Sequence, residues 1–244
     1  AYVITGPGLC NTMTPLGQAY SDSVPVLAIS SCLDETSAKR GQLHQMLDQE
    51  AAAATVCEWS YEARSASAAY QLIDRAFTEF ASARPRPKHI QVPIALAGEM
   101  AKGSAAALPK SAKPQVSQAL LYEAVAMILR AEKPIFVFGG GAVAGADVVG
   151  DLLRMTGAAS FTTYAGRGIV PSEALLHFGS TLARADTADV FAQSDLVVVV
   201  ASELSEVDLW RDDLGHDCPM IRVDLDASIL AQGRAGDLLL LGDA

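Results

Sequence analysis

Short, largely apolar runs separated by helical patterns are the feature that most constrains the fold of this chain of 244 residues. In the second half these runs lie at 135–138, 160–163, 196–201 and 220–224. Runs without polar alternation are typical of strands that are buried on both faces of a parallel sheet. Helical patterns fill the spaces at about 117–131, 147–155 and 187–193. The pattern predicts a doubly wound α/β domain over 117–244.

The first part of the chain shows the same alternation. Its apolar runs lie at 3–5, 25–30 and 88–93, and its helical patterns at about 9–20, 44–54 and 66–82. In the last of these, large apolar residues recur at a spacing of three or four and therefore share one face of a helix. We predict a second parallel-sheet unit over 1–95. The segment 96–116 has two prolines and no periodicity, which is typical of a linker.

Composition and charge exclude several functional classes. The net charge is −10 and no cluster of Lys or Arg is present, which argues against a nucleic-acid surface. The longest apolar run, 196–201, is too short to cross a bilayer, and no signal-peptide pattern opens the sequence, so we expect a cytoplasmic protein without membrane contact. The scattered cysteines lack CxxC spacing and the histidines lack paired spacing, so no metal site is predicted.

A strand, a tight turn and a helix start meet at residues 3–11. Gly6 and Gly8 permit positive φ and close backbone approach, while Pro7 fixes one φ and removes one N–H group. Open α/β sheets bind ligands at the carboxyl ends of their strands. The turn is therefore a candidate ligand site, and an ordinary strand-to-helix connection is the alternative.

Several segments in order carry a resemblance to a known family. They are Gly6-Pro-Gly-x-x-Asn11, 18–29, 40–49 and 83–93 in the first part, then Lys133-Pro-Ile-Phe-Val-Phe-Gly-Gly-Gly-Ala142, 162–171 and His177-Phe-Gly179. This succession resembles the thiamine-diphosphate-dependent 2-oxoacid enzymes, within them the branch of acetolactate synthase and 2-oxoacid decarboxylases. The resemblance covers nearly the whole chain.

The resemblance implies a fragment of a larger enzyme. The family's subunit has a catalytic glutamate well upstream of the Gly-Pro-Gly turn, and a last domain whose Gly-Asp-Gly…Asn motif holds magnesium and the diphosphate. Here the Gly-Asp pairs at 150, 236 and 242 are followed by Leu or Ala. We therefore expect the later, incomplete part of the pyrimidine-binding domain over 1–95 and the central domain over 117–244, inactive by themselves. The parent would use thiamine diphosphate and magnesium to decarboxylate or join 2-oxoacids, as a homo-oligomer (dimer or tetramer).

The resemblance also implies site residues. Gly6, Pro7, Gly8 and Asn11 match the turn beside the pyrimidine ring of the cofactor, although Asn11 can equally be a polar residue of a helix start. His44 and Gln45 match a polar pair on the substrate side. They are the candidate catalytic residues, because a neutral histidine can donate or accept a proton near pH 7. A surface histidine on a polar loop is the alternative.

The turn after the strand at 135–138 supports a competing interpretation. Gly139-x-Gly141-x-x-Ala144 is similar to a dinucleotide-binding turn, but it lacks the third glycine and the later acidic residue. Acetolactate synthases bind FAD in this domain through a Gly-Met-x-Gly-like stretch, and the departure of residues 177–183 from it argues against FAD. The alternatives are a two-domain nucleotide-binding module that uses the Gly139–Gly141 turn, and a non-catalytic structural remnant.

Overall fold

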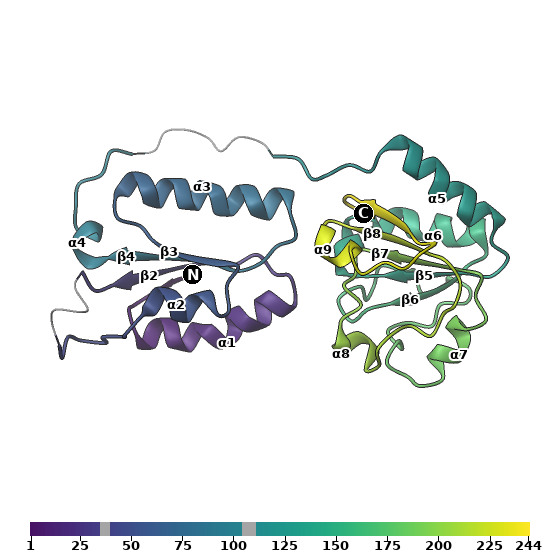
Figure 1. Cartoon of the computed structure of the whole chain (residues 1–244), viewed down its shortest axis with the longest axis horizontal. Helices are drawn as coiled ribbons and strands as arrows, with labels where there is room; N and C mark the ends of the chain where they lie inside the picture. The colour runs from purple at the N-terminus through teal and green to yellow at the C-terminus, as the bar shows by residue number, and fades with distance from the viewer. Residues whose placement is uncertain (35–39, 104–110) are drawn as a thin grey trace. The chain divides into compact units, whose positions relative to one another are not determined.

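The computed structural model describes residues 1–34, 40–103 and 111–244. The chain divides into two compact units, Ala1–Ala112 and Lys113–Ala244, and the division falls within the segment 96–116 that we predict to be a linker. Each unit is one parallel sheet with helices on both faces (Figure 1). The predicted fold class, two parallel-sheet α/β domains, is therefore confirmed.

The first unit has a four-stranded sheet in the order β1-β2-β4-β3, with all neighbouring strands parallel. The strands are β1 (Tyr2–Val3), β2 (Leu27–Cys32), β3 (Trp59–Glu62) and β4 (Lys88–Pro93). In Figure 1, α1 (Pro7–Ser21) and α2 (Gln49–Ala54) lie on one face of the sheet and α3 (Ala66–Ser82) on the other. The short α4 (Ile94–Ala97) follows β4. The carboxyl ends of the strands therefore share one edge, which includes the Gly6 turn.

Two predictions for this unit were wrong in detail. The helix expected over 44–54 begins only at Gln49, because His44 has φ 58° and the Asp48 side chain caps the helix by accepting from Ala51 N at 2.9 Å. Strand β3 was not predicted, since its four residues include the polar Ser60 and Glu62 and carry little apolar signal. The unit is thus βαβαβαβ rather than βαβαβ. The sequence also predicts a polar loop over 31–39, of which residues 35–39 lie outside the described residues.

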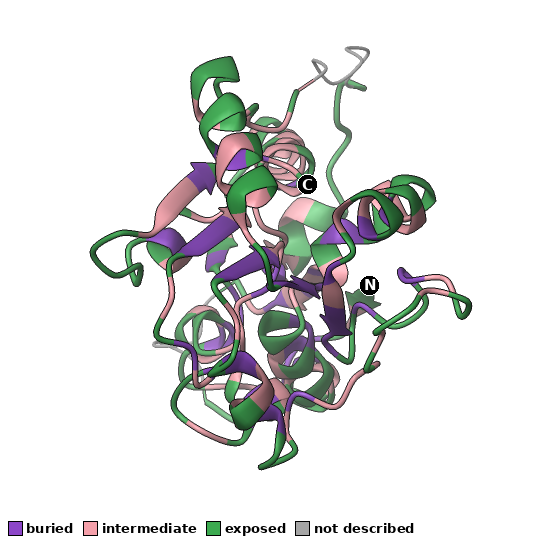
Figure 2. Ribbon diagram, turned by 90° about the vertical axis from the view of Figure 1, so that its right-hand side faces the viewer, coloured by how far each residue is buried: buried purple, intermediate pink, exposed green. Residues whose placement is uncertain are grey.

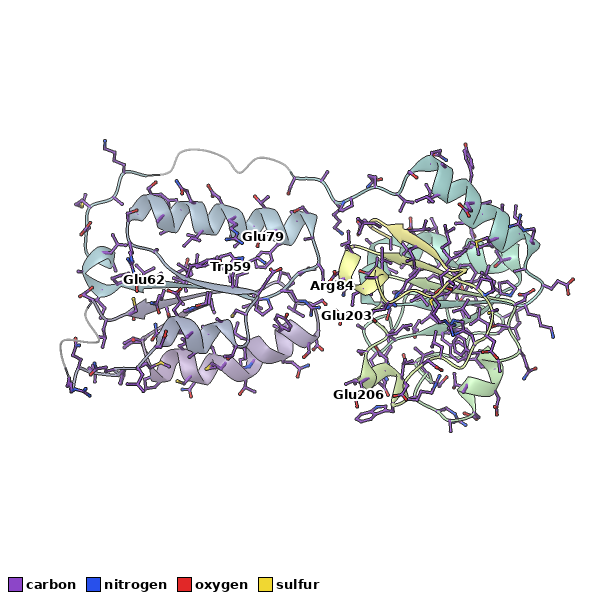
Figure 3. All side chains as sticks on the ribbon, viewed as in Figure 1. Trp59, Glu62, Glu79, Arg84, Glu203 and Glu206 are labelled. Atoms are coloured by element: carbon purple, nitrogen blue, oxygen red, sulfur yellow. The ribbon has the colours of Figure 1, made fainter. Side chains whose placement is uncertain are left out.

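A buried cation holds α3 to the amino end of this sheet. Lys88, the first residue of β4, is 1% exposed, and its ammonium group pairs with Glu58 and, at 3.0 Å, with Glu79 of α3. Trp59 Nε1 also donates to Glu79 at 2.8 Å, and both residues are labelled in Figure 3. The lysine is satisfied within the fold, so we assign it a structural role.

The second unit has a five-stranded sheet in the order β6-β5-β7-β8-β9, again parallel throughout. The strands are β5 (Pro134–Phe138), β6 (Ala159–Thr162), β7 (Leu196–Val200), β8 (Met220–Asp224) and β9 (Leu238–Leu241). The helices are α5 (Gln118–Arg130), α6 (Ala146–Thr156), α7 (Thr187–Phe191), α8 (Glu206–Leu209) and α9 (Ala227–Leu230). Parallel pairing of the four predicted runs is confirmed, and β9 is an additional edge strand.

The strands of the second unit are buried on both faces, which explains their uninterrupted apolar character. Phe136 and Val198 pack with α5 and α6, whereas Val137 and Val199 pack in a second cluster with Phe191 of α7. In Figure 2 the strands are largely purple and the outer helical surfaces largely green. In the part of the chain that the structure describes, no helix has both the length and the apolarity needed to cross a membrane.

Candidate functional site

The turn between β1 and α1 is shaped by its contact with the loop before α2. Gly6 has φ 65° and precedes Pro7, the first residue of the helix. A Cβ atom on Gly6 would collide with the carbonyl oxygen of His44 and lie 2.9 Å from its Cβ atom. Glycine is therefore required because the His44 loop packs on the turn. At Gly6 itself, the space that a Cβ atom would need is occupied by the His44 backbone.

The structure brings some of the predicted site residues together. Gly6 and His44 are in contact. Pro7 and Asn11 are exposed and lie one helical turn apart on α1. Gln45 accepts a 3.4 Å hydrogen bond from Gln42 N. His44 Nδ1 is buried and has no hydrogen-bond partner among the described residues. Such an atom is rare in a folded protein and marks a place where a bound group can supply the partner.

Gln49 joins these elements and was missed by sequence reasoning. Its side chain is 7% exposed, and its Oε1 accepts from Gly6 N and from Thr5 Oγ1, each at 2.9 Å. Its Nε2 donates to Ser31 O at 2.9 Å and Ser30 Oγ at 3.0 Å. The only signal in the sequence is its position within the segment 40–49, because a glutamine carries no mark of burial.

The hydrogen-bond chain continues across the sheet to a buried histidine. Ser30 Oγ, which accepts from Gln49, lies 2.8 Å from His89 Nε2. His89 Nδ1 lies 2.7 Å from Ser60 Oγ, so each ring nitrogen has a hydroxyl partner. Burial lowers the pKa of His89 from 6.5 to about 4, so the ring is neutral at pH 7. His89 is therefore a satisfied residue of the core, and we assign it a structural role.

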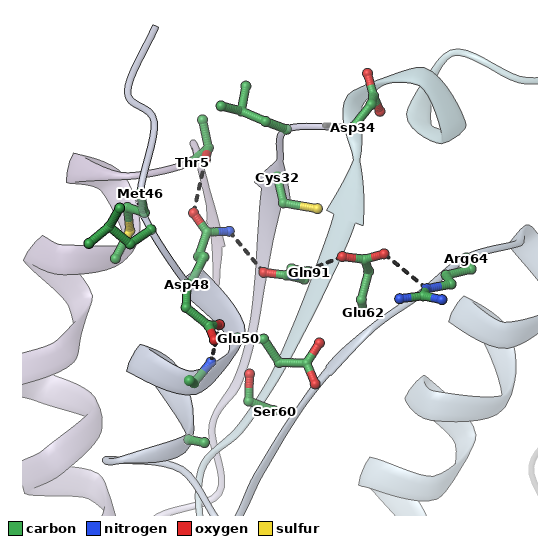
Figure 4. A pocket seen from close by; sticks show the side chains of 15 residues that line it. Thr5, Cys32, Asp34, Met46, Asp48, Glu50, Ser60, Glu62, Arg64 and Gln91 are labelled. Atoms are coloured by element: carbon green, nitrogen blue, oxygen red, sulfur yellow. Dashed lines mark hydrogen bonds and ion pairs between the residues drawn. The ribbon is translucent and has the colours of Figure 1, made fainter. Parts of the chain in front are cut away.

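A cavity of about 610 Å³ opens at the same carboxyl edge, and Thr5, Gln49 and Ser60 contribute to its wall (Figure 4). Its charged lining consists of Asp34, Asp48, Glu50, Glu62 and Arg64. The cavity therefore carries an excess of negative charge. Figure 4 draws the chain of contacts that runs from Thr5 through Gln49 and Gln91 to Glu62 and Arg64.

The carboxylates of this cavity differ in how they are satisfied. Asp34 accepts from Ala95 N at 3.0 Å, Asp48 caps α2, and Glu62 accepts from Gln91 at 2.8 Å and pairs with Arg64 at 3.1 Å. Glu50 has no hydrogen-bond or ion-pair partner in residues 1–34, 40–103 and 111–244. It is thus the carboxylate that can most readily bind a cation.

Burial and the nearby carboxylates raise the pKa of a thiol in the cavity wall, Cys32. Cys32, at the end of β2, is 4% exposed. Burial raises its pKa to about 12, together with smaller contributions from the charges of Glu62, Asp34 and Glu50. Cys32 is therefore a protonated, unreactive wall residue. Among the described residues, no group of three His, Cys, Asp or Glu side chains is arranged to hold a metal ion.

The glycines at the turn after β5 are explained by packing within the second unit. A Cβ atom on Gly139 would collide with the carbonyl oxygen of Ala201, and one on Gly141 would lie 2.7 Å from the Ala201 Cβ atom. The turn itself is a 3₁₀ helix, Gly140–Gly145. The space beside the glycines is filled by the end of β7, so the geometry does not favour the nucleotide-binding alternative.

Comparisons with known proteins cover both units. Residues 121–244 match the family described as thiamine pyrophosphate enzyme, central domain, and residues 1–52 match thiamine pyrophosphate enzyme, N-terminal TPP binding domain. The chain is 37% identical to a probable 2-ketoarginine decarboxylase of Pseudomonas aeruginosa, over 100% of this chain and 44% of that protein. It is 26% identical to an acetolactate synthase of Mycobacterium bovis, over 98% of this chain and 40% of that protein.

A solved structure has the same fold. An enzyme from Mycobacterium smegmatis, described as thiamin diphosphate-dependent, superposes with a TM-score of 0.84 at 22% identity, over 99% of this chain and 48% of that one. The chain thus spans less than half of the length of the relatives that it matches. Because the central-domain match alone covers more than half of the chain, and the predicted resemblance is confirmed in both units, the chain belongs to the thiamine pyrophosphate enzymes.

Proposed function

We propose that this chain forms part of a thiamine-diphosphate-dependent enzyme that decarboxylates a 2-oxoacid. The observation that carries the proposal is the carboxyl edge of the first sheet. There the Gly6 turn, the His44 loop and an acidic cavity meet in a chain of this family. Decarboxylation is preferred to carboligation because the relative with 37% identity is a probable decarboxylase, whereas the acetolactate synthase is 26% identical.

Two observations at the turn support a contact with one side of the cofactor. Pro7 and Asn11 present an exposed surface, and the buried Nδ1 of His44 lacks a partner within the described residues. We propose that Gly6, Pro7, Gly8 and Asn11 hold the pyrimidine ring. When bound, thiamine diphosphate supplies the electron sink that decarboxylation requires. We propose that His44 and Gln45 lie on the substrate side and hold or move a proton there.

We propose a 2-oxoacid with a cationic end as the substrate. The cavity has four carboxylates and one arginine in its lining, and Glu50 is the carboxylate without a partner in the described part of the chain. A guanidinium group beside such a carboxylate makes charge-assisted, bidentate hydrogen bonds. The name of the Pseudomonas relative points to the same class, since 2-ketoarginine carries a guanidinium group.

Other parts of the active site would come from outside this sequence. The Gly-Asp-Gly motif that would hold magnesium and the diphosphate is not found in it. We propose that the full-length protein supplies this motif and the catalytic glutamate, and that it is a cytoplasmic homo-oligomer.

The test is a measurement of CO₂ release by the full-length protein, with and without thiamine diphosphate and magnesium. We expect turnover of 2-ketoarginine that depends on the cofactor and exceeds the turnover of 2-oxohexanoate and of pyruvate. We expect no turnover by the 244-residue chain alone. Absence of cofactor-dependent decarboxylation of all three acids by the full-length protein would contradict the proposed function, and a preference for pyruvate would contradict the proposed substrate class.

A further inference from the structure

We propose that Gln49 is a positioning residue, which holds the Gly6 turn and the His44 loop in one fixed arrangement for cofactor binding. The proposal rests on the proposed function, because it assigns a role within the same site. Neither residue type nor motif indicates this role. It follows from where the side chain lies and from which groups it bonds.

The acceptor side of the amide fixes the turn. Gly6 N–H donates to Gln49 Oε1 at 2.9 Å, and the hydroxyl of Thr5 donates to the same oxygen at 2.9 Å. Thr5 and Gly6 are both buried, so loss of the glutamine oxygen leaves two donors without their acceptor inside the fold. Pro7 has no N–H group, so the turn is anchored by the N–H groups before it: Gly6 N donates to Gln49, and Thr5 N donates to Ser31 Oγ at 3.0 Å. A buried donor without an acceptor is costly, so loss of Gln49 favours movement of the turn.

The donor side of the amide fixes Gln49 to β2. Its Nε2 donates to the carbonyl oxygen of Ser31 at 2.9 Å and to Ser30 Oγ at 3.0 Å. The amide cannot be reversed, since the backbone N–H of Gly6 needs an oxygen and the carbonyl of Ser31 needs an N–H group. One orientation therefore satisfies both ends. The side chain links the turn after β1 to the end of β2 with a single geometry.

The backbone of Gln49 connects the His44 loop, on the proposed substrate side, to the Gly6 turn. Gln49 is the first residue of α2 and lies five residues after His44, whose carbonyl packs on Gly6. The turn is thus held from two sides, by the His44 backbone and by the Gln49 side chain. Replacement of Gln49 should therefore alter the positions of Pro7 and Asn11, which are exposed at the start of α1.

Gln91 provides a matched control. It is also a buried glutamine of the same network, 6% exposed, and it contacts Gln49 at 3.4 Å and Glu62 at 2.8 Å. Within the described residues, its side chain makes no hydrogen bond to the Gly6 turn. Replacement of either glutamine by methionine removes buried hydrogen bonds of the sheet edge, but only replacement of Gln49 removes the acceptor of Gly6 N–H. A general loss of stability would therefore affect Gln49→Met and Gln91→Met alike. A positioning effect would affect only Gln49→Met.

The experiment compares Gln49→Met, Gln49→Glu and Gln91→Met in the full-length protein. We expect Gln49→Met to raise the Kd for thiamine diphosphate about tenfold or more, the effect of losing one buried hydrogen bond. Hydrogen exchange of the peptide that contains Gly6 should rise in the absence of cofactor. Gln91→Met should leave the Kd for thiamine diphosphate and the hydrogen exchange of the Gly6 peptide within about twofold of the wild-type values. Gln49→Glu should recover affinity as the pH is lowered, because only a protonated carboxyl group can both accept from Gly6 and donate to β2.

The outcomes separate this inference from the function on which it rests. If the wild type binds cofactor and Gln49→Met binds it equally well, Gln49 does not position the site, and the proposed function stands. Equal losses in Gln49→Met and Gln91→Met, or no recovery in Gln49→Glu, would show a merely structural role and overturn the inference. If the wild type binds no thiamine diphosphate, the proposed function and this inference both fail. If Gln49→Met does not fold, the pH dependence of Gln49→Glu decides.

Discussion

The carbonyl oxygen of His44 occupies the space that a Cβ atom on Gly6 would need. Both residues have positive φ, 58° and 65°, so two unusual backbone conformations meet at one contact. Positive φ at a non-glycine residue is uncommon and persists only where the surrounding structure determines it. The contact joins the candidate cofactor turn to the candidate substrate loop, and its removal should affect both.

Replacement of Gly6 by alanine should destabilise the first unit by at least about 3 kcal/mol, because backbone strain adds to displacement of the His44 loop. Gly41→Ala is the matched control, since Gly41 has φ 73° and nothing within 4 Å of its Cβ position. Gly41→Ala should lower the free energy of unfolding by only about 1 kcal/mol, because it adds backbone strain without a steric clash. Urea denaturation followed by Trp59 fluorescence in a Trp210→Phe background reports the first unit, as these are the two tryptophans of the chain. Equal losses in the two variants would refute the steric argument.

The stability of the first unit should depend on pH through His89. Its folded-state pKa, about 4, lies below its ordinary value of 6.5, so the unfolded state takes up the proton first. Stability is therefore full above pH 6.5 and decreases as the pH falls toward 4, by up to about 3 kcal/mol. His89→Gln should remove this dependence, measured by the same Trp59 fluorescence. A histidine NMR titration with a midpoint near 6.5 for His89 would contradict the prediction.

The cysteines should differ sharply in reactivity. Cys10 is exposed, whereas Cys32 and Cys57 are 4% and 5% exposed. Burial raises their pKa to about 12 and about 11, so neither thiol ionises at pH 8. Iodoacetamide should modify Cys10 in the folded chain and modify Cys32 and Cys57 only in urea, as peptide mass spectrometry can measure. Rapid labelling of Cys32 without denaturant would show that the cavity wall opens.

Replacement of Glu50 by glutamine should weaken recognition of a cationic substrate. In the full-length protein we expect kcat/KM for 2-ketoarginine to fall about tenfold, in line with the loss of one charged hydrogen bond. The value for the neutral 2-oxohexanoate should change less than twofold. Glu123→Gln, an exposed residue of α5, is the charge-matched control and should alter neither. Equal reductions for both acids would assign Glu50 a role other than recognition of the cation.

The sequence by itself determined the fold class and the positions of most strands and helices. The runs 135–138 and 196–201 are apolar throughout because both faces of a central parallel strand are covered, and this requirement is visible in the residues. The periodicity of α3 likewise defines its bounds, Ala66–Ser82. The resemblance of the segments around Gly6 and 133–142 identified the family, because those segments combine motif and order.

Only the tertiary structure decided how the candidate site is assembled. Strand β3 is short and half polar, so its pairing with β4 supplies the stability that its local sequence does not indicate. Gln49 and Gly6 lie 43 residues apart, and no local pattern shows that one bonds the other. The sequence shows a glycine at 6 that permits close backbone approach, and only the fold shows that the His44 backbone is one group that approaches it. Contacts between distant segments depend on the packing of the whole unit, which a local pattern does not contain.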